Sequence, residues 1–123
     1  MVAQLETPTL NLRISQPLTV AGLVQVFTSS QRNFFTTVMA HALRMSGQGT
    51  SVLIVQFLKG GINQGHKHPV RLGQNLDWVR CALPRCIDTP ELDESQKLSL
   101  TDLWRYTQAA VCEGRYSLVV LDE

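Results

Sequence analysis

The segment Ser51–Leu58 constrains the fold of this chain more than any other feature of the sequence. It reads Ser-Val-Leu-Ile-Val-Gln-Phe-Leu, a nearly continuous apolar run that is rich in β-branched residues. Such a run is typical of a strand buried on both faces, as in a parallel sheet with helices on each side. A strand with one face in water alternates apolar and polar residues instead. The segment therefore predicts an α/β domain.

The segments around this strand fit the same architecture. Leu23–Thr28 is apolar and β-branched, which predicts a strand, and the polar run Ser29–Asn33 follows it as a loop. Apolar residues then recur at helical spacing until Gly47, a residue type that commonly follows a helix end. Residues 1–21 predict an irregular lead-in with one short edge strand at Leu10–Ile14.

The second half of the chain predicts one further helix and two further strands. Ser99 is the expected N-cap of that helix and Gly114 the expected residue after its end. We expect the strand at 23–28 to lie centrally, beside the final strand. The full expected order is a strand at 23–28, a helix at 35–46, strands at 51–58 and 76–81, a helix at 100–113 and a strand at 117–123.

Composition excludes several classes of protein. The chain has 123 residues, of which 44% are hydrophobic and 17% charged, so it is neither disordered nor rich in charge. Eleven Lys and Arg against ten Asp and Glu give a net charge of +1, which argues against a nucleic-acid partner. No apolar run approaches the roughly 20 residues of a membrane span, and Met1–Thr9 lacks the pattern of a secretory signal. Together with three cysteines that form no C-x-x-C pair, this predicts a cytoplasmic protein.

Strand, loop, helix and buried strand, followed later by a strand ending in acids, is the layout of a P-loop nucleotide-binding domain of the RecA-like type. In such domains the first loop and the helix after it bind phosphates through backbone N–H groups. A lysine contacts the terminal phosphates, Ser or Thr holds Mg²⁺, and a carboxylate at a neighbouring strand end supports the metal. We therefore expect a P-loop-like domain over residues 22–123.

Particular motifs give a more specific resemblance. Gly22–Thr28, Val55–Gly60 (Val-Gln-Phe-Leu-Lys-Gly), Trp104 and Tyr116–Glu123 (ending Leu-Asp-Glu) resemble the P-loop-type ATP:corrinoid adenosyltransferases. The resemblance implies ATP and Mg²⁺ as cofactors and a corrinoid as the substrate whose cobalt is adenosylated. Family members continue past Leu-Asp-Glu, so it also implies that the domain is truncated after this strand.

The expected phosphate loop departs from the family pattern, which reads G-x-G-K-G-K-T-T. In the ungapped register Phe34 stands at the place of the phosphate-binding lysine. No glycine lies between Gly22 and Gly47, and no lysine precedes Lys59. A loop without glycine adopts the required backbone angles only at a cost. The sequence therefore predicts weak binding of ATP.

Several residues remain as candidates for that weak site. The resemblance places the phosphate-loop positions and a lysine after the second strand near the nucleotide: Ser29, Ser30, Gln31, Arg32, Asn33, Thr36, Thr37 and Lys59. Arg32 stands at the place of the family's first loop lysine. Asp122 and Glu123 match the family's strand-end acids and are the candidate Mg²⁺ ligands. A polar turn and solvated surface charges are the alternative interpretation of all these residues.

Other chemistry-bearing residues give weaker signals. His66 and His68 flank Lys67 without a nearby cysteine or carboxylate pair, which is a poor ligand set and favours exposed loop imidazoles. The family's Phe-Thr-Trp element that faces the corrinoid is absent from Ala82–Asp88. No catalytic residue is therefore assigned. Two functions stay open: a divergent adenosyltransferase, or a non-catalytic binding or regulatory relative. Exposed sheet edges and a truncated core predict self-association, of which a homodimer is one form, or low stability.

Overall fold

The computed structural model describes residues 22–28, 30, 33–61 and 64–122, and the chain divides into two compact units, 1–32 and 33–123. The expected strand at Leu10–Ile14 lies outside the described residues.

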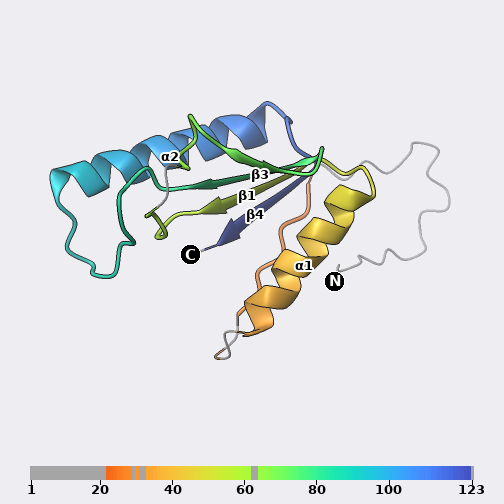
Figure 1. Cartoon of the computed structure of the whole chain (residues 1–123), viewed down its shortest axis with the longest axis horizontal. Coiled ribbons are helices and arrows are strands. Elements are labelled where there is room, and N and C mark those ends of the chain that lie inside the picture. Colours follow the sequence, from red (N-terminus) through yellow and green to blue (C-terminus); the bar gives the residue numbers. More distant parts are fainter. Residues whose placement is uncertain (1–21, 29, 31–32, 62–63, 123) are drawn as a thin grey trace, which may run out of the picture. The chain divides into compact units, whose positions relative to one another are not determined.

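The unit 33–123 is built on a four-stranded sheet in the order β2-β3-β1-β4 (Figure 1). The central strand β1 (Val52–Gln56) pairs in parallel with β3 (Leu76–Arg80) on one side and β4 (Leu118–Asp122) on the other. A short strand that the sequence did not predict, β2 (Val70–Leu72), pairs antiparallel with β3 at the sheet edge. The mostly parallel α/β fold expected from the sequence is confirmed.

The strand β1 holds the core together because all five of its residues are buried. Its side chains alternate between two clusters. Leu53 and Val55 pack with Leu103 and Ala110 on one face of the sheet. On the other face, the second cluster consists of Ala42, Val52, Ile54 and Leu76. This two-sided burial is what a continuous apolar run predicts.

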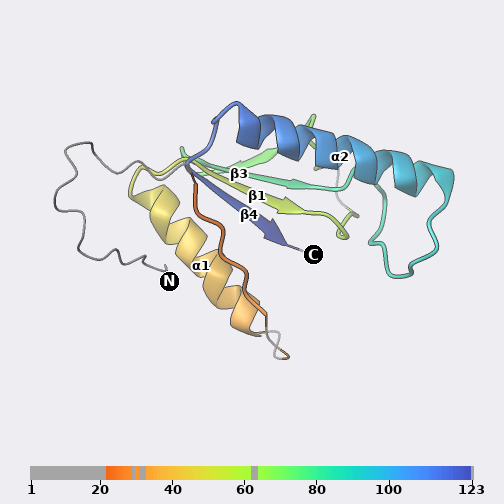
Figure 2. The same ribbon diagram turned by 180° about the vertical axis from the view of Figure 1, so that it is seen from behind.

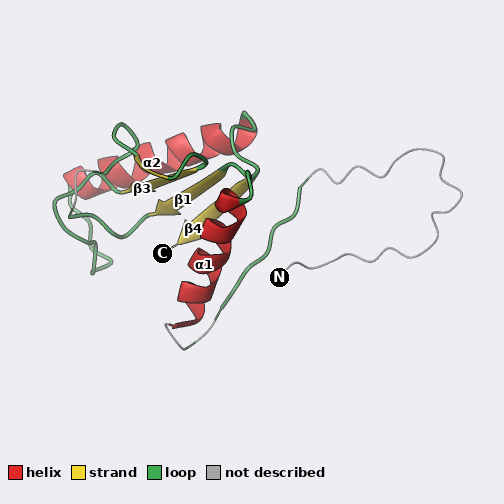
Figure 3. Cartoon of the chain, turned by 45° about the vertical axis from the view of Figure 1, so that its right-hand side comes forward, coloured by secondary structure: helices red, strands yellow, loops and turns green. Residues whose placement is uncertain are grey.

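The two helices lie on opposite faces of the sheet (Figures 1 and 2). The helix α1 (Asn33–Gly47) contributes Met39 and Ala42 to one cluster, in agreement with the helix expected at 35–46. The helix α2 (Glu94–Cys112) buries Leu103, Thr107 and Ala110. Figure 3 shows the sheet between the two helices.

The start of α2 corrects the sequence prediction. The helix begins after Asp93, whose side chain accepts a hydrogen bond from the Gln96 backbone N–H at 2.8 Å. The Gln96 side chain accepts from the Asp93 backbone N–H at 3.0 Å, which completes a capping box. Ser99, the expected N-cap, lies inside the helix. The sequence did not identify Asp93 as the cap because Asp93 lies in an acidic, proline-containing stretch that was predicted to be a loop. Gly114 follows the helix with a φ of 65°, as expected.

The strand expected at 23–28 is not present. Residues 22–28 form neither helix nor strand, and all seven residues are exposed. The prediction rested on the apolar, β-branched pattern, on the polar run that follows it and on the family resemblance of Gly22–Thr28. Such a pattern becomes a strand only when its backbone pairs with a neighbour, and the described residues of the unit 1–32 include no strand. The described sheet therefore ends at β4, without the expected strand beside it.

Among the described residues, no helix combines the length and the hydrophobicity that a membrane crossing requires.

Candidate functional site

The carboxyl ends of the three parallel strands place three polar side chains in one row. In the observed register Gln56 is the partner of Arg80 on β3 and of Asp122 on β4. Strand ends at this edge are where open α/β sheets bind their ligands. The last residues of β3, β1 and β4 therefore form the candidate site, which we call the carboxyl edge (Figure 3).

The side chain of Gln56 links the whole row, although it is only 6% exposed. Its Nε2 donates a hydrogen bond to Asp122 Oδ2 at 2.8 Å. Its Oε1 accepts two hydrogen bonds, one from the indole Nε1 of Trp78 at 2.8 Å and one from Arg80 Nε at 2.9 Å. Because donors and acceptors differ on the two sides, these contacts fix which way the amide points.

The predicted residues Lys59 and Asp122 are brought together at this edge. The Lys59 Nζ lies 3.6 Å from Asp122 Oδ2, with the two side chains 35% and 15% exposed. The backbone N–H of Phe57 donates to the Asp122 carbonyl at 3.2 Å, which ties the segment after β1 to β4. A cation from the segment after β1 and a carboxylate from the end of β4 thus share one small region.

The Arg80 guanidinium is held by three neighbours. Besides its bond to Gln56, it donates from an Nη atom to the Gly60 carbonyl at 3.3 Å. Its Cζ also lies 4.9 Å from the centroid of the Trp78 ring. Gly60 packs so closely that an added Cβ would lie 2.7 Å from the carbonyl oxygens of Leu83 and Arg85. The loop after β1 is therefore fitted tightly beside Arg80.

The sequence missed three members of this network. Gln56 belongs to the motif Val55–Gly60 but was assigned no role, and Trp78 and Arg80 were assigned none either. A signal was present, because Gln56 is the one polar residue inside the apolar run. Buried polar side chains require hydrogen-bond partners. The partners themselves depend on the register between β1 and β3, which the sequence alone did not provide.

Most of the predicted phosphate-loop residues stay untested. Ser29, Gln31, Arg32 and Glu123 lie outside the described residues. Asn33 begins α1, and Thr36 and Thr37 lie in its first turns with exposed side chains. Ser30 is exposed and belongs to the other unit, so it is not placed relative to the carboxyl edge.

A second polar cluster lies on β3 away from this edge. Arg71 Nε donates to Asp77 Oδ1 at 3.0 Å, and the Tyr116 hydroxyl donates to Asp77 Oδ2 at 2.6 Å. Burial alone would raise the pKa of Asp77, but the hydrogen bonds from Arg71 and Tyr116 and the charge of Arg71 lower it below its usual value. Burial and the bond to Asp77 raise the pKa of Tyr116. This cluster joins β2, β3 and the segment before β4.

The histidines behave differently from one another. The His66 ring is half-buried and stacks on Tyr106, with ring centroids 5.3 Å apart, which corrects the expectation of an exposed imidazole. His68 is exposed as expected. Among the described residues, no group of three or more His, Cys, Asp or Glu has the arrangement of a metal site.

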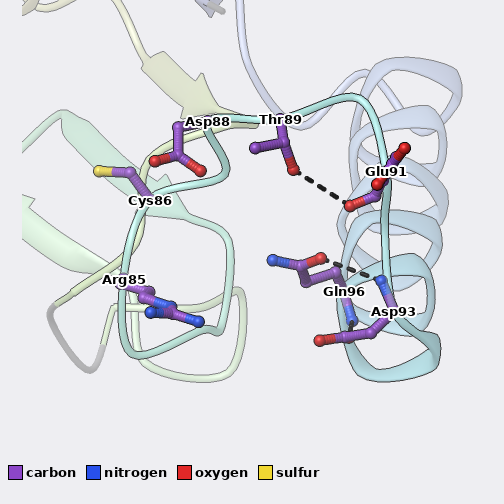
Figure 4. A pocket seen from close by; sticks show the side chains of 7 residues that line it. All are labelled: Arg85, Cys86, Asp88, Thr89, Glu91, Asp93 and Gln96. Carbon is purple, nitrogen blue, oxygen red and sulfur yellow. Dashed lines mark hydrogen bonds between the residues drawn. The ribbon is translucent and has the colours of Figure 1, made fainter.

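A shallow polar hollow lies between the loop after β3 and the start of α2 (Figure 4). Its volume is about 320 Å³. Thr89 Oγ1 donates to the Glu91 carbonyl at 3.2 Å on one side, and the Asp93–Gln96 capping box forms the other side. The hollow is lined by Arg85, Cys86, Asp88, Thr89, Glu91, Asp93 and Gln96. Asp93 caps α2, and Asp88 and Glu91 are exposed. The residues that line the hollow therefore indicate no catalytic or binding role.

Comparison with known proteins identifies the family. Residues 20–123 match the family model described as ATP:corrinoid adenosyltransferase BtuR/CobO/CobP. The corrinoid adenosyltransferase of Escherichia coli (strain K12) is 25% identical over 111 residues, which cover 90% of this chain and 56% of that protein. The corrinoid adenosyltransferase of Escherichia coli O6:H1 gives the same values. The chain thus spans about half the length of these relatives, and no solved structure matches it significantly. With the family model covering most of its length, the chain belongs to the ATP:corrinoid adenosyltransferase family.

Proposed function

We propose that this chain is a divergent ATP:corrinoid adenosyltransferase homologue that binds the phosphates of ATP at the carboxyl edge of its sheet. The observation that carries the proposal is the contact of Lys59, in the segment after β1, with Asp122 at the end of β4, at 3.6 Å. A cation for phosphate and a carboxylate for a metal are the two charges that phosphoryl groups require from a protein. Family membership supports ATP as the nucleotide and a corrinoid as the second substrate.

Lys59 is the phosphate-binding residue in this proposal. Its ammonium is a compact charge on a flexible stem, and the side chain is 35% exposed, so it can turn from Asp122 to an incoming anion. The adjacent Gly60 fixes the loop that carries it, because a side chain there would clash with two carbonyl oxygens. Lys59 is thus a mobile side chain on a rigid backbone.

The residues at this edge fit a magnesium ion that arrives with the nucleotide. Protein sites for Mg²⁺ commonly supply one or two carboxylates and leave the other positions to phosphate and water. Asp122 supplies one carboxylate, whose Oδ2 atom accepts a hydrogen bond from Gln56. Glu123 follows Asp122 in the sequence. When bound, the ion would neutralise phosphate charge. Lys59 competes for the same carboxylate, which favours binding of the ion together with ATP rather than before it.

The affinity for ATP is expected to be low. The segment Ser29–Thr37 has neither the glycines nor the lysine of the family's phosphate loop. Loss of one buried, charge-assisted contact to phosphate costs on the order of 2–5 kcal/mol. That cost corresponds to a roughly 30- to several-thousand-fold weaker affinity. The expected dissociation constant for Mg-ATP is high micromolar or weaker.

Calorimetric titration with Mg-ATP tests the site. Lys59→Met should weaken binding by about tenfold or more, since it removes a charged hydrogen-bond donor from the phosphates. Lys97→Met is the matched control, because Lys97 lies on α2 and pairs there with Glu94. Equal affinities for wild type and Lys59→Met would overturn the proposed site. A sub-micromolar dissociation constant for wild type would overturn the proposed weakness.

An anaerobic assay of corrinoid adenosylation tests the activity. We expect no turnover above the no-protein control for this chain, since positioning of the triphosphate is most of what such a site contributes to the reaction. Turnover that disappears in Arg32→Ala would show that Arg32 replaces the missing lysine and that the activity persists.

A further inference from the structure

We propose that Arg80 is an anion-binding residue of the carboxyl edge, oriented by Gln56 and Trp78 to bind a phosphate oxyanion. The inference deepens the proposed function, on which it rests for the identity of the anion. Arg80 is the last residue of β3, and nothing in the family's loop pattern pointed to it.

The first argument is charge. Arg80 is half-buried, yet in the described part of the chain no carboxylate lies within ion-pair distance of it. The other cation at this edge, Lys59, has Asp122 at 3.6 Å. Asp122 meets Arg80 only indirectly, through the neutral amide of Gln56. A partly buried charge without a counter-ion is costly, and binding of an anion removes that cost.

The second argument is orientation. The bond to Gln56, the bond to the Gly60 carbonyl and the stacking over Trp78 hold the guanidinium in one place. Two of its five N–H groups make these bonds, and the other three have no acceptor among the described residues. A fixed guanidinium with free, parallel N–H groups matches the geometry of phosphate oxygens. A purely structural arginine would use these donors within the protein.

The third argument is location. Arg80 and Asp122 flank Gln56 in one row, and Lys59 follows the same strand end. In the described part of the chain, the cations Lys59 and Arg80 share this edge with the carboxylate of Asp122, and Asp122 lies within ion-pair distance of Lys59 but not of Arg80. Arg80 therefore supplies, from a strand end, part of the positive charge that the loop Ser29–Thr37 lacks.

The structure also provides a way to observe binding at Arg80. Trp78 donates to Gln56 and lies under the guanidinium, so a change at Arg80 alters the surroundings of its indole. The chain has two tryptophans, and the other, Trp104, is 48% exposed with its ring centroid 6.0 Å from Phe57. Trp104→Phe keeps an aromatic ring at that position and leaves Trp78 as the sole fluorophore.

The test is a fluorescence titration of the Trp104→Phe protein with inorganic tripolyphosphate, ATP and adenosine, each with calorimetry in parallel. We expect tripolyphosphate and ATP to change Trp78 emission and adenosine not to do so. Arg80→Met should lower the affinity for both tripolyphosphate and ATP by about 10- to 100-fold, as expected for a lost charged hydrogen bond. Arg105→Gln, which changes an exposed arginine on α2, should leave both affinities unchanged.

Arg80→Lys keeps the proposal testable if Arg80→Met fails to fold. The lysine retains the charge but not the planar fork, so its affinity should fall between those of wild type and Arg80→Met. Unchanged affinity in either variant, or a wild-type protein that binds no tripolyphosphate, overturns the inference.

The outcome also separates this inference from the proposed function. If ATP binds through Lys59 while Arg80 variants match wild type, the inference is wrong and the proposed function stands. If tripolyphosphate binds through Arg80 as tightly as ATP, and Lys59→Met binds ATP as tightly as wild type, the proposed function is wrong and the anion site at Arg80 stands without it.

Discussion

The side chain of Gln56 donates a hydrogen bond to Asp122 Oδ2 at 2.8 Å, from the end of one parallel strand to the end of the next. This bond aligns the strand-end carboxylate that the sequence identified with a glutamine that it did not. The same glutamine accepts from Trp78 and Arg80. The geometry of the carboxyl edge therefore depends on one amide group.

Removal of that amide should destabilise the protein. Gln56→Leu preserves volume but removes the hydrogen bonds that Gln56 makes with Trp78 Nε1, Arg80 Nε and Asp122 Oδ2. Unsatisfied buried polar groups cost about 1–3 kcal/mol each when water does not reach them. We expect the free energy of unfolding in urea to fall by about 2 kcal/mol or more. Gln108→Leu, at an exposed position on α2, is the control and should change it little. An equal effect of both variants would contradict the role of Gln56.

Gly60 should not accept a side chain. In Gly60→Ala the Cβ would lie 2.7 Å from the backbone oxygens of Leu83 and Arg85, and backbone cannot yield as a flexible side chain does. We expect a loss of about 1–3 kcal/mol, as for other overpacked sites. Gly47→Ala is the matched control, since nothing lies within 4 Å of the Cβ there. Thermal melts of the two variants side by side decide the matter, and a loss in Gly47→Ala as large as in Gly60→Ala would count against this explanation.

The cap of α2 distinguishes the structure from the sequence prediction. Asp93→Ala removes the acceptor of the Gln96 backbone N–H and should cost about 0.5–2 kcal/mol. Ser99→Ala, at the N-cap expected from the sequence, removes only a bond of 3.4 Å to the Ala82 carbonyl and should cost less than Asp93→Ala. Urea unfolding measures both. A larger effect at Ser99 would mean that the helix begins there.

The cap illustrates what the sequence could and could not predict. The central strand, both helices and the final strand follow from local patterns, namely the apolar run Ser51–Leu58 and the helical spacing around Leu103. The start of the second helix does not follow from a local pattern, because Asp93 is one of several acidic and polar residues in the segment 82–98. The strand expected at Leu23–Thr28 failed for the complementary reason. Its pattern is locally correct, but a strand exists only where a partner edge pairs with it.

The candidate site, like the fold, was predicted from the sequence only in part. Lys59 and Asp122 were found through motifs that are contiguous in the chain. Arg80 and Trp78 were not, because their role depends on alignment of β3 with β1, which a single strand does not encode. Pairing register is set by contacts between strands. Residues whose contacts arise only from register are therefore the ones that sequence reasoning missed.

Asp77 should make stability depend on pH in acid. Its folded pKa lies below the ordinary value of 3.8, so the unfolded chain binds the proton more readily. The contribution of Asp77 is thus complete above about pH 4 and is lost as the pH falls through the folded pKa. Urea unfolding between neutral pH and pH 2 should show a steeper loss for wild type than for Asp77→Asn, which does not titrate. Asp102→Asn, at an exposed position on α2, should follow the wild-type curve. Parallel curves for wild type and Asp77→Asn would exclude this linkage.

Restoration of the phosphate loop should raise the affinity for nucleotide. The double change Asn33→Gly and Phe34→Lys returns one glycine and the phosphate-binding lysine to the positions that the ungapped register assigns to them. A recovered charge-assisted hydrogen bond to phosphate should tighten Mg-ATP binding by about 10- to 100-fold. The control is Leu43→Lys on the same helix, which adds the same charge at an exposed position outside the segment Ser29–Thr37. Calorimetry that gives equal affinities for the double variant and this control would show that the register is wrong. A gain specific to the double variant would show that the missing glycine and lysine at these two positions limit the affinity of this chain for nucleotide.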